Sequence, residues 1–215
     1  MSDETTDAQT GGPADEADLD RRHAEKMAKR KAARTRMLAD KTEERGLLIV
    51  HTGSGKGKST AAFGMAMRAI GHGMQVGIVQ FVKGAWTSGE RVVLDRFPDQ
   101  VTIEVLGEGF TWDTQDRQRD IAAAKAAWAV SREMIEDPQY GLVLLDELNI
   151  ALRYGHLEVA EVVAFLKDRP RDKHVCITGR NAPPELLEIA DLVTEMTLVK
   201  HPFQQGVKAQ KGLDF

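Results

Sequence analysis

A glycine- and lysine-rich stretch at residues 51–60, HTGSGKGKST, has the composition of a loop that binds phosphate groups. The usual pattern of such a loop is G-x-x-x-x-G-K-[ST], and the letters GKS at residues 57–59 match its end. Thr52 stands where the first glycine belongs, Gly53 lies one position too close, and Lys56 is an additional lysine. The stretch therefore predicts a phosphate site whose loop is shifted from the standard form.

Each part of this loop contributes to holding an anion. The glycines let the backbone turn its N–H groups inward, and the positive end of a following helix adds to the attraction. Lys58 brings a full charge, and the Ser59 hydroxyl is a ligand that Mg²⁺ accepts. We expect a nucleoside triphosphate to contact Thr52, Gly53, Ser54, Gly55, Lys56, Gly57, Lys58, Ser59 and Thr60.

Two carboxylates follow an apolar run in the stretch LVLLDE, residues 142–147. A buried strand that ends in an acid is the usual source of the carboxylate on the Mg²⁺ side of a phosphate-loop enzyme. Asp146 and Glu147 are therefore candidates for the metal side of the site, together with Ser59.

Short apolar runs alternate with helix-forming segments from Gly46 onward. This alternation predicts an α/β fold of the RecA-like phosphate-loop class, with a mostly parallel sheet and helices on both faces. Ligands of such sheets bind at the carboxyl ends of the strands. We expect strands at 46–51, 74–82, 101–107, 141–147, 174–179 and 191–199, and helices at 57–71, 114–136, 156–167 and 183–190.

The composition limits the classes of partner. A net charge of −4 gives no support for a nucleic-acid partner, and no apolar run approaches the roughly 18 residues that cross a membrane. The one cysteine, Cys176, lies in an apolar strand pattern, where we expect it to be a buried small residue. The first ten residues have no signal-peptide pattern, so we expect a cytoplasmic protein.

The N-terminal region divides by charge. Residues 1–19 hold six acidic residues and no lysine or arginine, which predicts a disordered tail. Residues 20–45 hold ten Lys or Arg against five Asp or Glu and are rich in helix formers, which predicts a basic helix. The composition leaves open whether this helix is only solvated or covers an anionic ligand or a partner chain. The α/β domain is expected at 46–215.

These residues alone leave three activities open for the nucleotide site: a hydrolytic motor or switch, a kinase, or a reaction at another part of ATP. No guanine-reading Asn-Lys-x-Asp sequence occurs, which disfavours a GTP switch. A nucleoside kinase with a multi-cysteine zinc site is disfavoured by the single cysteine.

Four stretches together resemble the phosphate-loop family of ATP:corrinoid adenosyltransferases. They are HTGSGKGKSTAAFGMAMRAIGHG, VQFVKGAWTSGE, GEGFTWDTQD with the later DE, and HPFQQGVKAQKGLDF; ITGRNAP is a fifth. The resemblance runs from about residue 20 to the C-terminus. It implies an alkyl transferase that moves the 5′-deoxyadenosyl group of ATP to the cobalt of a Co(I) corrinoid and releases triphosphate, in adenosylcobalamin biosynthesis or salvage.

The resemblance also implies roles at the nucleotide. The shifted loop is the family's usual form, and Lys58 is expected to stabilise the charge of the leaving triphosphate together with Lys56 and Mg²⁺ or Mn²⁺. Ser59 and Glu147 are the expected metal ligands, with Asp146 as second choice. Arg180 and Asn181, which follow the strand HVCIT, are expected near the phosphates, and the C-terminal GVKAQKGLDF is expected to complete the nucleotide site.

On the corrinoid side, the resemblance assigns Phe110 and Trp112 of GFTW to displacement of the lower axial ligand of cobalt. A four-coordinate Co(II) is easier to reduce to Co(I), because removal of an axial donor lowers the energy of the orbital that accepts the electron. Weaker candidates for corrinoid or interface contact are Lys83, Gly84, Trp86 and Glu90.

The partners implied are ATP, a corrinoid such as cob(I)alamin or cobyrinic acid a,c-diamide, and a flavin or flavoprotein reductant. The basic N-terminal helix resembles a lid that folds over the active site, often that of the partner in a homodimer, and excludes water. The alternative from a different class is a RecA-like ATPase or small-molecule kinase, which would release ADP or phosphate without a corrinoid.

Overall fold

The computed structural model describes residues 15–82, 88–107 and 116–214. The chain forms two units, residues 1–44 and residues 45–215. The second unit begins at residue 45, and the α/β domain was expected to begin at residue 46, where the alternating apolar pattern starts.

The described part of the first unit is one helix, α1 (Glu16–Ala39). It begins four residues before the expected start at residue 20, because the Asp15 side chain accepts a hydrogen bond from the N–H of Ala17 at 3.4 Å. Asp18 in the first turn forms an ion pair with Arg22 at 2.8 Å, which adds to the helix start. The helix ends at Ala39, and residues 41–47 have no regular structure, so the expected helix of 20–45 is displaced toward the N-terminus.

The second unit is built on a parallel sheet with the order β3-β2-β4-β5-β1-β6 in the part of the chain that the structure describes. In this order the phosphate-loop strand β1 and the acidic strand β4 are separated by β5. The strands are β1 (Leu48–Thr52), β2 (Gln75–Gln80), β3 (Val101–Val105), β4 (Tyr140–Asp146), β5 (His174–Thr178) and β6 (Leu192–Glu195).

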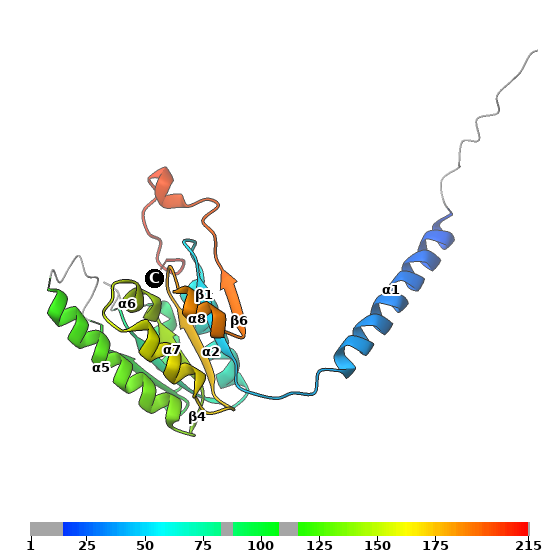
Figure 1. Cartoon of the computed structure of the whole chain (residues 1–215). Coiled ribbons are helices and arrows are strands. Elements are labelled where there is room, and N and C mark those ends of the chain that lie inside the picture. The colour runs from blue at the N-terminus through cyan, green and yellow to red at the C-terminus, as the bar shows by residue number, and fades with distance from the viewer. Residues whose placement is uncertain (1–14, 83–87, 108–115, 215) are drawn as a thin grey trace, which may run out of the picture. The chain divides into compact units, whose positions relative to one another are not determined.

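Helices cover both faces of this sheet (Figure 1). Alternate residues of β1 point to opposite faces: Leu48 packs in one apolar cluster with Trp128, and Ile49 packs in the other with Phe63. One face is covered by α2 (Lys58–Gly71) and α3 (Gly89–Leu94), and the other by α5 (Arg117–Glu136), α6 (Leu148–Arg153), α7 (Val159–Lys167) and α8 (Pro184–Ile189). The predicted α/β fold is thus confirmed.

The structure corrects some predicted boundaries. The short helices α3 and α6 were not expected, and β6 ends at Glu195 rather than at Val199. The neighbouring strand β1 already ends at Thr52, and the next N–H of the chain, that of Met196, donates to the Thr52 carbonyl at 2.9 Å. Beyond it the segment pairs with no strand among the residues that the structure describes, and the chain continues over the phosphate loop to a short 3₁₀ helix, η1 (Pro202–Gln205).

Two further expectations concern burial. Cys176 has no exposed surface, which confirms the prediction of a buried apolar role, and burial raises the pKa of its thiol to about 12. Within the residues described, no helix is long and apolar enough to cross a membrane.

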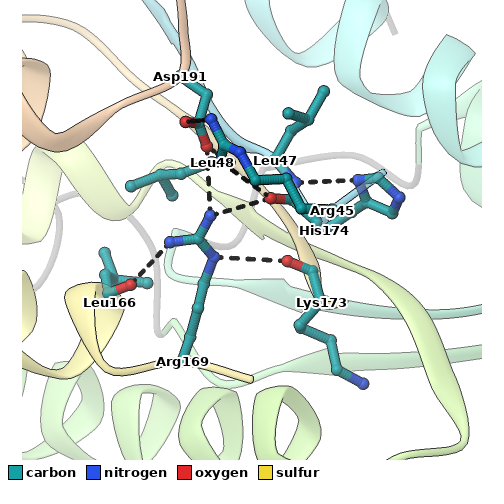
Figure 2. Close-up of polar contacts among 9 residues, drawn as sticks. Arg45, Leu47, Leu48, Leu166, Arg169, Lys173, His174 and Asp191 are labelled. Carbon is teal, nitrogen blue, oxygen red and sulfur yellow. Dashed lines mark hydrogen bonds and ion pairs between the residues drawn. The ribbon is translucent and has the colours of Figure 1, made fainter. Parts of the chain in front are cut away.

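A polar network fixes the start of β1 at the amino end of the sheet (Figure 2). Asp191 accepts a hydrogen bond from the N–H of Leu48 at 2.8 Å and forms an ion pair with Arg45 at 2.6 Å. The Arg169 guanidinium donates to Asp191 and to the Gly46 carbonyl, both at 3.3 Å. The hydrogen bonds from Arg45 and Leu48 lower the pKa of the Asp191 carboxyl, against an opposing effect of burial. This network anchors the strand whose other end carries the phosphate loop.

Candidate nucleotide-binding site

The phosphate loop connects β1 to α2 and is held in shape by its glycines. Gly53 and Gly57 have φ angles of 97° and 109°, which L side chains rarely adopt. A Cβ on Gly53 would lie 2.4 Å from the carbonyl oxygen of Met196, and a Cβ on Gly55 would lie 2.6 Å from that of Thr197. The N–H of Gly55 also donates to the Met196 carbonyl at 2.6 Å. The segment after β6 therefore supports the loop by close backbone contact.

Lys58, the first residue of α2, bends back over the loop. Its Nζ donates to the carbonyl oxygens of Gly55 at 2.6 Å and Gly53 at 3.0 Å, and the residue is only 6% exposed. Burial lowers the pKa of its ammonium, and the nearby charge of Glu147 acts in the opposite direction. A charged amine held at the mouth of the loop is placed to meet an entering phosphate.

Lys56, the additional lysine of the shifted loop, forms an ion pair with Asp214 near the C-terminus. Asp214 also accepts a hydrogen bond from the N–H of Gln210 at 2.7 Å, which closes a turn of the C-terminal segment. The end of the chain accordingly returns to the carboxyl edge of the sheet, above the strands in Figure 1. Lys56 thus links the last residues of the chain to the phosphate loop.

The two carboxylates at the end of β4 have different surroundings. The oxygens of Asp146 are both hydrogen-bonded, Oδ1 to the hydroxyl of Thr178 at 2.8 Å and Oδ2 to the amide of Gln80 at 3.1 Å. Glu147 has a left-handed backbone, with φ 63°, and its Oε2 is buried without a hydrogen-bond partner among the residues described. Burial and the charge of Asp146 raise the pKa of Glu147 to about 7. Glu147 is therefore the carboxylate that is available to a ligand.

Arg180 follows β5 and lies within electrostatic range of both Lys58 and Glu147. Its side chain is exposed, and the next residue, Asn181, has a left-handed backbone with φ 55°. The loop is tied to the end of β1, because the N–H of Ala182 donates to the Thr52 hydroxyl at 3.0 Å. The structure thus brings together residues from the ends of β1, β4 and β5, as the sequence predicted.

The remaining predicted residues fall into two groups. Ser59 is half-buried in the first turn of α2, Ser54 and Thr60 are exposed, and Glu90 is half-buried in α3. The other corrinoid candidates lie outside the described residues: Lys83, Gly84, Trp86, Phe110 and Trp112.

Sequence reasoning missed the residues that support the carboxylates. Gln80 and Thr178 end their own strands, and each is polar after an apolar run, which is the signal that would have identified them. Asn149 lies in α6 with no exposed surface and donates to the Gly179 carbonyl at 3.0 Å, a contact that no spacing in the sequence indicates.

The site offers few protein ligands to a divalent cation. In the described ranges, no group of three or more His, Cys, Asp or Glu side chains could hold a metal ion. A Mg²⁺ that is bound through nucleotide phosphates needs only one or two protein carboxylates or hydroxyls, however. The buried Oε2 of Glu147 without a partner fits such a cation.

Comparison with known proteins identifies the family. The family model for ATP:corrinoid adenosyltransferase BtuR/CobO/CobP matches residues 44–215. A second model, for the cob(I)alamin adenosyltransferase N terminal region, matches residues 13–38.

Similar proteins carry the same description. A corrinoid adenosyltransferase of Sinorhizobium sp is 57% identical over 217 residues, which cover 100% of both chains. Those of Pseudomonas aeruginosa and Escherichia coli K12 are 57% and 46% identical, each over 91% of this chain and over 97% and 99% of theirs. Among solved structures, the flagellar accessory protein FlaH from Methanocaldococcus jannaschii has a TM-score of 0.46 at 13% identity and covers 71% of each chain.

Proposed function

The chain belongs to the ATP:corrinoid adenosyltransferase family, and we propose that its shifted phosphate loop binds all three phosphates of ATP as one leaving group. The protein is an enzyme that transfers the adenosyl group of ATP to a corrinoid, and it uses ATP and a corrinoid as substrates. The alternative of an ATPase or kinase is not favoured by these similarities. The observation that carries the proposal is the meeting of Lys58, Glu147 and Arg180 at one end of the sheet.

Charge around the triphosphate is the main requirement of this reaction. When a cobalt nucleophile attacks the 5′ carbon of ATP, the C5′–O bond breaks and its electron pair leaves with the triphosphate. No general base is needed, because the nucleophile carries no proton. Lys58 and Arg180 supply fixed positive charge, and Lys56 supplies more once it separates from Asp214. Preorganised charge of this kind stabilises the developing negative charge of the leaving group.

We propose that Ser59 and Glu147 hold a Mg²⁺ or Mn²⁺ ion on the phosphates. The cation would neutralise phosphate charge and so assist departure of the triphosphate. The unpaired Oε2 of Glu147 supports this role. Asp146 is assigned to orientation instead, since both of its oxygens already accept hydrogen bonds from the protein.

The corrinoid is proposed to bind at the same edge of the sheet, beside the loops that follow β2 and β3. Phe110 and Trp112 would displace the lower axial ligand of Co(II), while Lys83, Gly84, Trp86 and Glu90 would contact the corrinoid or a neighbouring chain. Support comes from the family membership and from the shared carboxyl edge of β2, β3 and β4.

The proposal for α1 is that it covers the active site of the partner in a homodimer and excludes water. Its support is the match of residues 13–38 to the family's N-terminal model and a surface rich in exposed Lys and Arg, which suits anionic substrates. Exclusion of water and oxygen would protect Co(I), and a flavin or flavoprotein is the proposed electron donor. A strongly reducing reaction that consumes ATP suits the cytoplasm.

The test is an anaerobic assay with ATP, Mg²⁺, a strong reductant and either cobalamin or cobyrinic acid a,c-diamide. The expected products are triphosphate and an adenosylated corrinoid in equal amounts, and the rate with each corrinoid shows which is preferred. Omission of the corrinoid serves as the control. Release of ADP or phosphate at the same rate without a corrinoid would contradict the proposal.

A further inference from the structure

The hydroxyl of Thr178 joins both carboxylate-bearing residues at the end of β4. It donates to Oδ1 of Asp146 at 2.8 Å and accepts a hydrogen bond from the backbone N–H of Glu147 at 2.9 Å. Thr178 ends the neighbouring strand β5 and has no exposed surface. A single buried side chain therefore contacts two consecutive residues of the candidate metal side.

The direction of these two bonds follows from the chemistry of the groups. A backbone N–H can only donate, so the Thr178 oxygen accepts from Glu147 and its one hydrogen is directed to Asp146. The lone pair that remains faces the N–H of Glu147. Because the other oxygen of Asp146 accepts from Gln80, this carboxylate cannot rotate without losing a bond. Thr178 is thus held in one orientation by a fixed acid.

The backbone of Glu147 needs such support. Its φ of 63° is unfavourable for a residue with a side chain, and among the described non-glycine residues only Asn181 shares a positive φ. Residues in such conformations persist where the surroundings over-determine them, commonly at functional sites. The bond from the Glu147 N–H to Thr178 is one such constraint, and α6 begins at the very next residue.

The residue after Thr178 is Gly179, which has no side chain and so leaves room for the Glu147 carboxylate. A Cβ on Gly179 would lie 3.1 Å from Oε2 of Glu147 and 2.8 Å from the Cβ of Asn149. Asn149 in turn donates to the Gly179 carbonyl at 3.0 Å, which fixes this turn from the side of α6. Gly179 therefore packs against the Glu147 side chain, while Thr178 holds the Glu147 backbone.

We propose that Thr178 is a positioning residue, which holds the Glu147 carboxylate in place for the cation on the ATP phosphates. This rests on the proposed metal role of Glu147. The hydroxyl does so without touching substrate or cation, through the left-handed turn that it stabilises. Its loss lets Glu147 relax to an ordinary backbone conformation, and the carboxylate then points elsewhere.

The test removes the hydroxyl of Thr178 and keeps the size and branching of its side chain. Thr178→Val is isosteric, Thr178→Ser restores the hydroxyl, and Thr178→Ala removes it without apolar bulk in case the valine variant is insoluble. The probe is Mn²⁺, whose affinity for the protein–ATP complex is measured by electron paramagnetic resonance. ATP affinity without metal and thermal stability are measured in parallel. Ser131→Ala is the matched control, since Ser131 is equally buried and its hydroxyl donates to the Ala127 carbonyl at 2.7 Å, in α5.

The expected result is a loss of about tenfold or more in Mn²⁺ affinity for Thr178→Val, the size seen when groups that orient metal ligands are removed. Metal-free ATP affinity should change less than about twofold, and Thr178→Ser should recover most of the loss. Ser131→Ala should lower thermal stability and leave Mn²⁺ affinity unchanged.

Glu147→Gln separates the two ways in which the proposal can fail. If this variant loses Mn²⁺ affinity but Thr178→Val and Thr178→Ala do not, Thr178 is only structural and the positioning role is wrong, while the metal role of Glu147 stands. If Glu147→Gln also keeps normal Mn²⁺ affinity, the proposed metal role itself is wrong, and the positioning role is overturned with it.

Discussion

The ammonium of Lys58 lies 2.6 Å from the carbonyl oxygen of Gly55, so this lysine bonds back to the phosphate loop that precedes it. Because the same Nζ also donates to Gly53, two of its three hydrogens are used on backbone acceptors. Lys58 thus ties the turns at Gly53 and Gly55 together, and we propose that the same charge faces the phosphates of ATP.

Removal of this lysine should reduce catalysis strongly. Lys58→Ala takes away a main charge facing the triphosphate, and the rate of adenosyl transfer should fall by about 10²–10³. Lys167→Ala, on the exposed side of α7, is the control and should keep normal turnover. Steady-state rates with saturating ATP and reduced corrinoid make the comparison. Turnover of Lys58→Ala at the level of the control would show that the loop does not serve the leaving group.

The ion pair between Lys56 and Asp214 should weaken ATP binding, because the carboxylate competes with phosphate for the same ammonium. Asp214→Asn is therefore expected to tighten ATP by about two- to fivefold, the range that partly exposed ion pairs allow. The effect should shrink at high salt. Calorimetric titration with ATP measures it, with Asp99→Asn as the control. Weaker binding by Asp214→Asn would mean that Asp214 contacts the nucleotide directly.

The stability of the ligand-free protein should fall as the pH rises toward neutrality, because of Glu147. Its pKa is raised in the folded state from 4.5 to about 7, so the protonated form is favoured by folding. Its contribution is fully present below about pH 4.5 and is lost as the pH rises through 7, by about 3 kcal/mol at most.

Glu147→Gln should remove this dependence, while Glu188→Gln, which changes an exposed acid of α8, should keep it. Urea unfolding between pH 5 and 8 in the presence of a chelator, in roughly half-unit steps, gives the comparison. If the unfolding free energy of the wild type and of Glu147→Gln changed equally with pH, the raised pKa assigned to Glu147 would be contradicted.

The network at the start of β1 should affect stability and leave chemistry unchanged. Asp191→Asn removes the charge that pairs with Arg45 and Arg169 and weakens the bond from the Leu48 N–H. The cost should be about 1–3 kcal/mol, or a few degrees in melting temperature. Since the pKa of Asp191 is lowered, its stabilisation is present above its unfolded pKa and is lost as the pH falls through its folded pKa. A Michaelis constant for ATP that rises with Asp191→Asn would show coupling to the loop.

The sequence predicted those parts of the site whose functional groups occur together in a short stretch of the chain. The phosphate loop, the acids after β4 and Arg180 after β5 each follow an apolar run, and parallel strands bring their carboxyl ends to one edge. Thr178 was missed because its partner, Asp146, lies far away in the sequence. Asp214 lies in the C-terminal stretch expected at the nucleotide site, but its pairing with the distant Lys56 was not foreseen for the same reason. Such pairs depend on strand register and on the path of the C-terminal segment, which periodicity does not encode.

The same reasoning explains the errors in element boundaries. The apolar letters up to Val199 predicted a longer β6, but a strand lasts only as long as its neighbour, and β1 ends at Thr52. The start of α1 at Glu16 was set by a capping acid, Asp15, which composition had assigned to the tail. Local hydrogen bonds thus decided where elements begin and end, while the apolar pattern decided their type.

Trp112 tests the corrinoid side of the proposal most sharply. If this residue only fills a core, Trp112→Ala should destabilise the protein by about 3–5 kcal/mol, and every activity should fall with it. If Phe110 and Trp112 displace the lower cobalt ligand, the variant should stay folded and keep its ATP affinity. It should then lose activity chiefly when bound Co(II) must first be reduced, because that step needs the four-coordinate form.

The loss should be smaller when Co(I) is supplied chemically, since Co(I) no longer holds a lower ligand. The measurement is therefore a ratio: the rate with Co(II) and a mild reductant divided by the rate with preformed Co(I). We expect this ratio to fall in Trp112→Ala and to be unchanged in Lys58→Ala, whose defect lies at the phosphates and affects both rates alike. An unchanged ratio in a folded Trp112→Ala would remove the role given to this aromatic residue and leave the phosphate site standing, because the two arguments share no residue.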